Sequence, residues 1–190
     1  MMLGNKSDLR RRMKQVRSEI PPEIRAVQNQ QIAKRVLAHP AWQKAHTIFC
    51  YCSTDDEIDT YPLLHGALEQ GKALCLPLAM PGGRMEARRV TDLTQLQPGL
   101  QGILEPCPAC PVIPPAEISL CIIPCLAADL FGYRLGYGGG YYDRFLVQTN
   151  AIRMVLCAES RVFPHIPVQD YDMPCDILVT ESKVVCLHEK

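Results

Sequence analysis

The sequence predicts a single three-layer α/β/α domain over residues 1–190, with a largely parallel central sheet. Short apolar segments alternate along the chain with segments of helical periodicity. These short segments are apolar throughout, which is typical of strands that are buried on both faces. A parallel sheet covered by helices buries its strands in this way. Ligands of such sheets bind beyond the carboxyl ends of the strands, so we expect functional residues to follow strands.

The composition is that of a globular protein, with 47% hydrophobic and 21% charged residues. Lysine plus arginine and aspartate plus glutamate both total 20, and a net charge of zero argues against a nucleic-acid partner. The N-terminal residues lack the apolar segment of a secretory signal, and no apolar stretch reaches about 18 residues. We therefore expect a cytoplasmic protein with no membrane partner. Most of the ten cysteines lie in apolar segments, where reduced thiols pack as small hydrophobic groups.

Helices are expected at the beginning of the chain. Residues 7–20 repeat apolar side chains at helical spacing and carry a basic face beside them. Pro21 and Pro22 end this helix and begin a second one, which runs to about Ala38, because proline is tolerated in a first helical turn. Residues 40–45 predict one more short turn of helix.

Strands and helices alternate in the rest of the chain. We expect strands at 47–52, 73–77, 85–90, 119–127, 154–159 and 177–180, and helices at 60–70 and 141–148. Residues 119–127 form a continuous apolar segment and are the best candidate for a central strand. Residues 97–117 are rich in proline and glycine and predict a long surface loop, which in a compact domain is often functional.

Residues 134–143, called here the glycine segment, are the strongest local feature. Glycine allows the backbone to approach a ligand closely, and the amides of such a loop and of the following helix suit a phosphate group. Arg134 at its beginning is able to contact phosphate through two donors, and Asp143 at its end is able to hold Mg²⁺. The alternative is a flexible turn before a helix whose positive end is stabilised by Asp143.

Three further segments carry weaker signals. Lys6 and Arg10 share a helix face and are able to bind a triphosphate together. The same spacing is found in a basic stripe that faces solvent or contacts RNA. Glu57 follows the first expected strand, where it is able to accept hydrogen bonds from amino or amide groups of a substrate, or simply belongs to a capped loop. Two aspartates, Asp172 and Asp176, precede the last apolar strand. Either one is able to complete a metal site, and the alternative is that they cap a turn.

Two closely spaced cysteine pairs are compatible with a zinc ribbon, which would make the protein an interaction module. These pairs are Cys107 with Cys110 and Cys121 with Cys125. The second pair lies in the expected central strand, where buried thiols are common, and its spacing is not that of a zinc knuckle. The first pair lacks the helix start that lowers the pKa of a redox-active thiol. The sequence therefore favours structural cysteines over zinc or redox chemistry.

Five segments in this order resemble the 5-formyltetrahydrofolate cyclo-ligase family over nearly the whole chain. They are residues 6–10, 56–60, 102–106, the glycine segment with its Tyr-Tyr-Asp ending, and 167–181. The family often has lysine where this chain has Gly139. The resemblance implies a single α/β domain that uses MgATP to convert 5-formyltetrahydrofolate to 5,10-methenyltetrahydrofolate, ADP and phosphate. We therefore expect a monomeric protein whose partners are two small molecules, 5-formyltetrahydrofolate and ATP.

The resemblance also implies roles for individual residues. Arg134 is the implied catalytic residue, since it would stabilise charge on the transferring phosphoryl group. The implied metal ligands are Asp143 and Asp172. The implied folate-binding residues are Glu57, Met85 and Glu105. The implied ATP-binding residues are Lys6, Arg10, Arg134, Gly136, Gly138, Gly139, Gly140, Tyr141 and Tyr142. Tyr141 and Tyr142 are each able to stack on a ligand or to pack in the core.

Other functions fit the same patterns. One alternative is a protein of the same fold that phosphorylates a different carbonyl-bearing substrate. Such a protein would use ATP and would not turn over the formylated folate. A second alternative is a protein of the same fold without catalysis that binds RNA or acts as a scaffold through the basic helix face. The zero net charge argues against this alternative.

Overall fold

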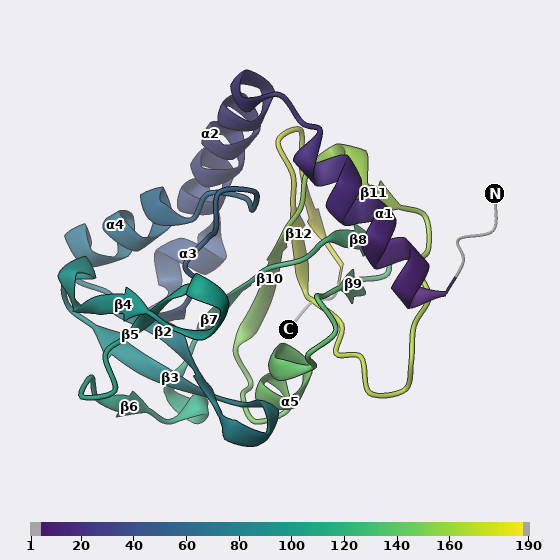
Figure 1. Ribbon diagram of the computed structural model, residues 1–190. Helices are drawn as coiled ribbons and strands as arrows, with labels where there is room; N and C mark the ends of the chain where they lie inside the picture. The colour runs from purple at the N-terminus through teal and green to yellow at the C-terminus, as the bar shows by residue number, and fades with distance from the viewer. Residues whose placement is uncertain (1–4, 188–190) are drawn as a thin grey trace.

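An eight-stranded sheet forms the centre of the computed structural model, which describes residues 5–187 (Figure 1). Its strands are β1 (Thr47–Phe49), β2 (Ala73–Met80), β3 (Arg84–Val90), β6 (Val112–Ile113), β7 (Leu120–Ile123), β10 (Ile152–Leu156), β12 (Ile177–Val179) and β13 (Val184–Cys186). They lie in the order β13-β12-β10-β7-β1-β2-β3-β6. From β12 to β2 the strands run parallel, whereas β13, β3 and β6 pair antiparallel. The predicted, largely parallel sheet is confirmed.

Helices cover both faces of this sheet. They are α2 (Pro22–Ala38), α3 (Pro40–Lys44) and α4 (Tyr61–Glu69) on one face, and α5 (Tyr141–Leu146) on the other. Trp42 of α3 is fully buried on the first face. On the second face Phe145 of α5 stacks on Phe49 of β1 with ring centroids 4.6 Å apart. Within residues 5–187, no helix has both the length and the apolar composition needed to cross a membrane.

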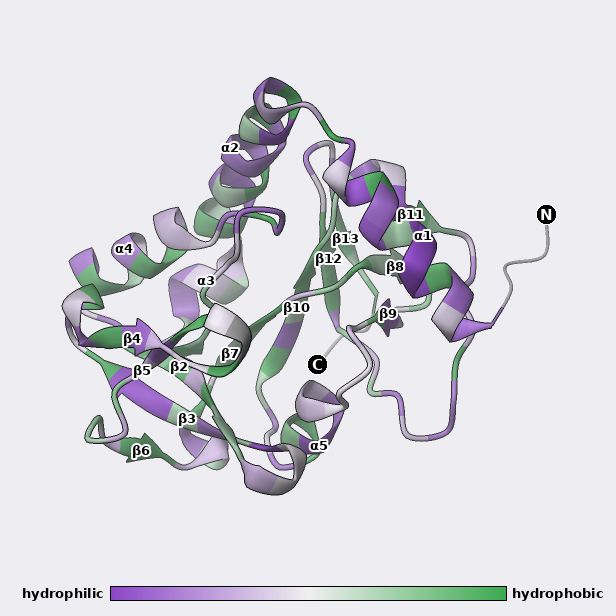
Figure 2. Ribbon diagram, in the orientation of Figure 1, coloured by the Kyte–Doolittle hydropathy of each residue, from purple (hydrophilic) through white to green (hydrophobic). Residues whose placement is uncertain are grey.

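The first helix packs on a smaller sheet. α1 (Lys6–Ser18) lies against β8 (Ala127–Asp129), β9 (Arg134–Leu135) and β11 (Val162–Phe163), which pair in the order β11-β8-β9. Leu9 and Met13 are buried in this contact. The remaining surface of α1 is mostly hydrophilic, as Figure 2 shows. Apolar spacing therefore fixes which face of α1 packs inward and leaves its basic face available for a ligand.

The segment 119–127 differs from the prediction of one strand. It contributes β7 to the large sheet and the first residue of β8 to the small one. The ladder ends near Pro124, because proline has no N–H to donate to a neighbouring strand. Residues 120–129 are all buried, so the apolar pattern continues across the break and does not reveal it.

The segment 97–117 is also more ordered than a surface loop. It contains most of a two-stranded sheet, in which β4 (Leu96–Pro98) pairs with β5 (Leu104–Pro106), and it ends in β6 and a short 3₁₀ turn. These strands have only two or three residues, which is too short for period-two alternation to be recognised.

Candidate functional site

A cleft of about 690 Å³ lies between α1, the glycine segment and the residues that follow β1 and β7. Side chains from β2 and β3 complete its walls. All the residues to which the family resemblance gives a role line this cleft: Lys6, Arg10, Glu57, Met85, Glu105, Arg134, Gly136, Gly138, Gly139, Gly140, Tyr141, Tyr142, Asp143 and Asp172. Segments from the two ends of the chain thus meet at one place, beyond the carboxyl ends of central strands, where ligands of parallel sheets bind.

The glycine segment forms one wall of the cleft between β9 and α5. Its backbone has positive φ at Gly138 (103°) and Gly140 (67°), where a side chain would strain the chain. Gly139 has no such φ, but a Cβ atom there would lie 2.8 Å from the Tyr141 ring. A side chain at position 139 therefore requires that Tyr141 moves. Successive backbone amides in a loop of this kind form a concave site for anions.

Tyr142 belongs to the core and to the cleft at the same time. Its ring lies 6.2 Å from the ring of Phe49, it packs against the buried residues on both faces of the sheet, and it also lines the cleft. Burial raises the pKa of Tyr142 well above its usual value, so the hydroxyl stays protonated.

Arg134 and Asp143 are paired across the two ends of the glycine segment. One terminal nitrogen of Arg134 donates to Asp143 Oδ1 at 2.9 Å, and the other donates to the carbonyl of Met173 at 2.9 Å. The Arg134 side chain is only 4% exposed. Burial opposes its charge, but Cys175 and Asp143 outweigh that effect and raise the pKa of Arg134. The guanidinium is thus a fixed, permanently charged group at the base of the cleft.

The basic face of α1 forms the second wall. Arg10 Nε donates to the carbonyl of Gly136 at 2.9 Å, which ties the helix to the glycine segment. Lys6 is paired with Asp172, whose Oδ2 also accepts from the amide of Gln169 at 2.7 Å. Four-residue spacing places Lys6 and Arg10 on one helical face, and the packing of α1 on the small sheet turns this face to the cleft.

Asp143 and Asp172 have a donor set that fits Mg²⁺. The amide of Met173, the residue next to Asp172, donates to Asp143 Oδ1 at 3.2 Å, and both aspartates line the cleft. The Oδ2 atom of Asp143 and the Oδ1 atom of Asp172 make no hydrogen bond within residues 5–187. Magnesium takes one or two carboxylates and completes its shell with phosphate oxygens and water. Asp176, the alternative ligand, is absent from the cleft wall, because its carboxylate accepts from the amide of Arg153 at 2.7 Å.

The folate-binding candidates lie in three different environments. Glu57 Oε2 accepts from the amide of Thr54 at 3.0 Å, in the loop after β1. Met85 lies half-buried on β3. Glu105 lies on β5, where burial raises the pKa of its carboxyl group.

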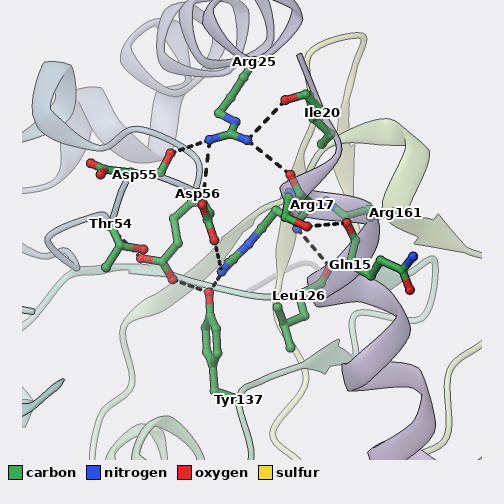
Figure 3. Close-up of polar contacts among 12 residues, drawn as sticks. Gln15, Arg17, Ile20, Arg25, Thr54, Asp55, Asp56, Leu126, Tyr137 and Arg161 are labelled. Carbon is green, nitrogen blue, oxygen red and sulfur yellow. Dashed lines mark hydrogen bonds and ion pairs between the residues drawn. The ribbon is translucent and has the colours of Figure 1, made fainter. Parts of the chain in front are cut away.

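Sequence reasoning missed a network at the end of the cleft (Figure 3). Tyr137 donates to Glu57 Oε1 at 2.5 Å and accepts from Arg17, which also donates to Asp56 at 3.3 Å. Arg25 of α2 donates to the carbonyls of Asp55 and Ile20 and joins the same network. The available signal was the basic face of α1, which continues past Arg10 to Arg17 at helical spacing.

The cysteines lie outside this site, apart from Cys52. All ten are free, and eight are buried. Cys107 and Cys110 line a separate cleft of about 450 Å³ beside β4. Within residues 5–187, no group of three or more His, Cys, Asp or Glu side chains is arranged to hold a metal ion.

A known family shares this sequence over nearly its whole length. The sequence model of the 5-formyltetrahydrofolate cyclo-ligase family matches residues 3–181. The chain belongs to this family. The 5-formyltetrahydrofolate cyclo-ligase of Escherichia coli K12 is 31% identical over 178 residues, which cover 90% of this chain and 98% of the relative. The Mus musculus 5-formyltetrahydrofolate cyclo-ligase is 28% identical, with 93% of this chain and 94% of the relative covered.

Solved structures share the fold of this family member. The NMR structure of Aquifex aeolicus 5,10-methenyltetrahydrofolate synthetase matches with a TM-score of 0.88 and 31% identity, covering 97% of this chain and 94% of that one. A 5,10-methenyltetrahydrofolate synthetase from Mycoplasma pneumoniae matches with a TM-score of 0.77 at 17% identity, over 94% and 99% of the two chains. The second likeness concerns the fold alone.

Proposed function

We propose that the protein converts 5-formyltetrahydrofolate to 5,10-methenyltetrahydrofolate and turns ATP into ADP and phosphate. Membership of the 5-formyltetrahydrofolate cyclo-ligase family supports the folate reaction. The observation that carries the proposal is the composition of the cleft. One continuous cleft combines fixed cations and a glycine-lined wall, which suit a triphosphate, with a carboxylate that suits the amino and amide groups of a pterin.

The reaction requires activation of a poor electrophile. The formyl oxygen of the folate attacks the γ-phosphorus of ATP, and ADP leaves. The oxygen thereby becomes part of a phosphate leaving group, and the formyl carbon becomes iminium-like. The second folate nitrogen attacks this carbon, phosphate leaves, and the nitrogen loses its proton. Because both groups belong to one molecule with a fixed ring geometry, closure has a high effective concentration.

The cations of the cleft supply positioning and charge stabilisation. Phosphoryl transfer depends mainly on these two effects, because the protein has little covalent chemistry to perform. Arg134 is held in place by Asp143 and Met173 and still has unused N–H donors for the transferring phosphoryl group. Lys6 and Arg10 line the cleft from α1, which supports a role for both in binding the phosphates of ATP.

Asp143 and Asp172 are proposed to hold Mg²⁺ through their unoccupied oxygens. When bound there with the phosphates, the ion supplies neutralisation of phosphate charge. The chain's own contribution is to hold each carboxylate in place. Arg134 is paired with Asp143, and Lys6 is paired with Asp172.

The remaining expectations concern the protein as a whole. We propose that residues 1–190 act as one domain, and that the protein works as a cytoplasmic monomer on small molecules without a nucleic-acid partner. The zero net charge and the position of the basic face of α1 inside the cleft support the last of these expectations, the lack of a nucleic-acid partner.

An absorbance assay tests the function. Purified protein is mixed with 5-formyltetrahydrofolate, Mg²⁺ and ATP, and the near-ultraviolet band of the methenyl product is followed. We expect a band that grows only when both ATP and Mg²⁺ are present. A flat trace from folded protein that binds ATP would overturn the folate assignment and favour a different carbonyl-bearing phosphoryl acceptor.

A further inference from the structure

Tyr137 occupies an unusual place in the glycine segment, because its hydroxyl has a carboxylate and a guanidinium as partners. Arg17 donates to the hydroxyl oxygen, and the hydroxyl lies 2.5 Å from Glu57 Oε1. An arginine has no acceptor, so of these two partners only Glu57 is able to accept the hydroxyl hydrogen. Tyr137 is therefore a fixed donor to this carboxylate.

Arg17 is the group that enforces this arrangement. Its side chain is 8% exposed, lies 5.4 Å from the centroid of the Tyr137 ring, and also donates to Asp56 Oδ2 at 3.3 Å. These contacts connect α1 to the glycine segment and to the loop after β1. Burial and the nearby Glu57 carboxylate raise the pKa of Tyr137, so the hydroxyl keeps its proton over the whole neutral range.

The two oxygens of Glu57 are consequently both oriented. Oε1 accepts from Tyr137, and Oε2 accepts from the amide of Thr54 at 3.0 Å. A carboxylate oxygen has two lone pairs, so each oxygen retains one for a ligand. A carboxylate held at both oxygens loses little rotational freedom when a substrate binds, which favours affinity.

We propose that Tyr137 and Arg17 are positioning residues that orient the Glu57 carboxylate for the folate and link it to the phosphate-binding wall. This inference rests on the proposed function, because it takes Glu57 as a folate contact. Tyr137 belongs to the same loop as Gly138 and Gly140, so the backbone that faces the nucleotide also carries the donor that fixes the folate carboxylate.

The tyrosine-to-phenylalanine variant tests the inference, since it keeps the ring and removes only the hydroxyl. We expect Tyr137→Phe to raise the KM for 5-formyltetrahydrofolate about tenfold, the scale for one hydrogen bond to a charged group. The KM for ATP and kcat should change by less than about threefold. Tyr133→Phe is the matched control, because Tyr133 packs beside α1 and does not line the cleft.

A double variant separates positioning from a merely structural role. If the hydroxyl acts through Glu57, Tyr137→Phe combined with Glu57→Ala, which removes both acceptor oxygens, should raise the folate KM no further than Glu57→Ala alone. Arg17→Lys keeps a positive charge but lacks the fork that reaches both Tyr137 and Asp56, so it should raise the folate KM with little effect on ATP. Multiplicative effects in the double variant would overturn the inference.

The inference and the proposed function fail in distinguishable ways. Wild-type protein that neither binds nor turns over 5-formyltetrahydrofolate refutes the proposed function, and the inference falls with it. Wild-type protein that is active, together with a Tyr137→Phe variant that has an unchanged folate KM, refutes only the positioning role. Equal increases in the folate and ATP KM values would likewise contradict it, because they indicate a general distortion of the cleft.

Discussion

Replacing Arg134 by methionine removes the charge at the base of the cleft and keeps a side chain of similar length. Losing one main stabiliser of transition-state charge costs about 100- to 1,000-fold in kcat. Asp143 also loses its charged partner and keeps only the hydrogen bond from the Met173 amide. Breaking a fully buried ion pair costs about 3–5 kcal/mol, but the Asp143 side chain is 24% exposed and water compensates in part. We therefore expect a loss of about 2 kcal/mol in the free energy of unfolding and a fall in kcat of at least about 100-fold.

The assay follows the methenyl product at saturating ATP and Mg²⁺, with unfolding measured in parallel in urea. Arg11→Met is the control, because the Arg11 side chain lies on the same helix as Lys6, is 81% exposed and does not line the cleft. Adding Asp143→Asn to Arg134→Met should restore most of the stability, since no unpaired carboxylate remains, without restoring kcat. A folded Arg134→Met protein with near-normal kcat would refute the assignment of Arg134 to phosphoryl transfer.

Three further predictions follow from the contacts described above. Glu57→Gln should weaken folate binding more than ATP binding in a titration of each ligand, and equal effects would place Glu57 elsewhere. Replacing both Cys107 and Cys110 by serine should leave turnover largely intact; a collapse of activity would revive a metal role for this pair. Burial opposes ionisation of Glu159, but hydrogen bonds, of which that from Lys183 is the largest, lower the pKa of Glu159 from 4.5 to about 2. The pair therefore stabilises the fold above pH 4.5, and this contribution disappears as the pH falls to about 2. Lys183→Met should reduce the difference in Tm between neutral and acidic pH, and an unchanged difference would contradict the role of the pair.

Local patterns were sufficient to predict the α-helices and the central strands, whereas β4, β5, β6, β9, β11 and β13 were not predicted from the sequence. Helical spacing placed α1 and α2 to within two residues at each end, because apolar periodicity extends over several turns. The parallel strands were recognised because they are apolar throughout. The break at Pro124 was missed for the same reason, since buried residues continue on both sides of it. The shortest strands, β6, β9 and β11, have two residues each, which is below the length at which any periodicity exists.

The candidate site was predicted in its members but not in its contacts. Residue types and spacing selected the glycine segment, the basic face of α1 and the carboxylates, and all of them line one cleft. The sequence did not indicate that Arg134 pairs with Asp143, and residue types alone left Asp172 and Asp176 as alternatives until the family resemblance selected Asp172. The ion pair and the position of Asp172 both depend on which strand or loop lies opposite each side chain after packing.

By itself, the sequence determined the alternation of strands and helices, the phosphate-suited glycine segment and the membership of a family. Those properties depend on neighbouring residues, so they can be read from spacing and composition. Only the tertiary structure decided that Tyr137 joins Arg17 to Glu57, because these partners lie 120 and 80 positions away along the chain. Their contact depends on the packing of α1 against the small sheet, and no local pattern carries information about a meeting over that distance.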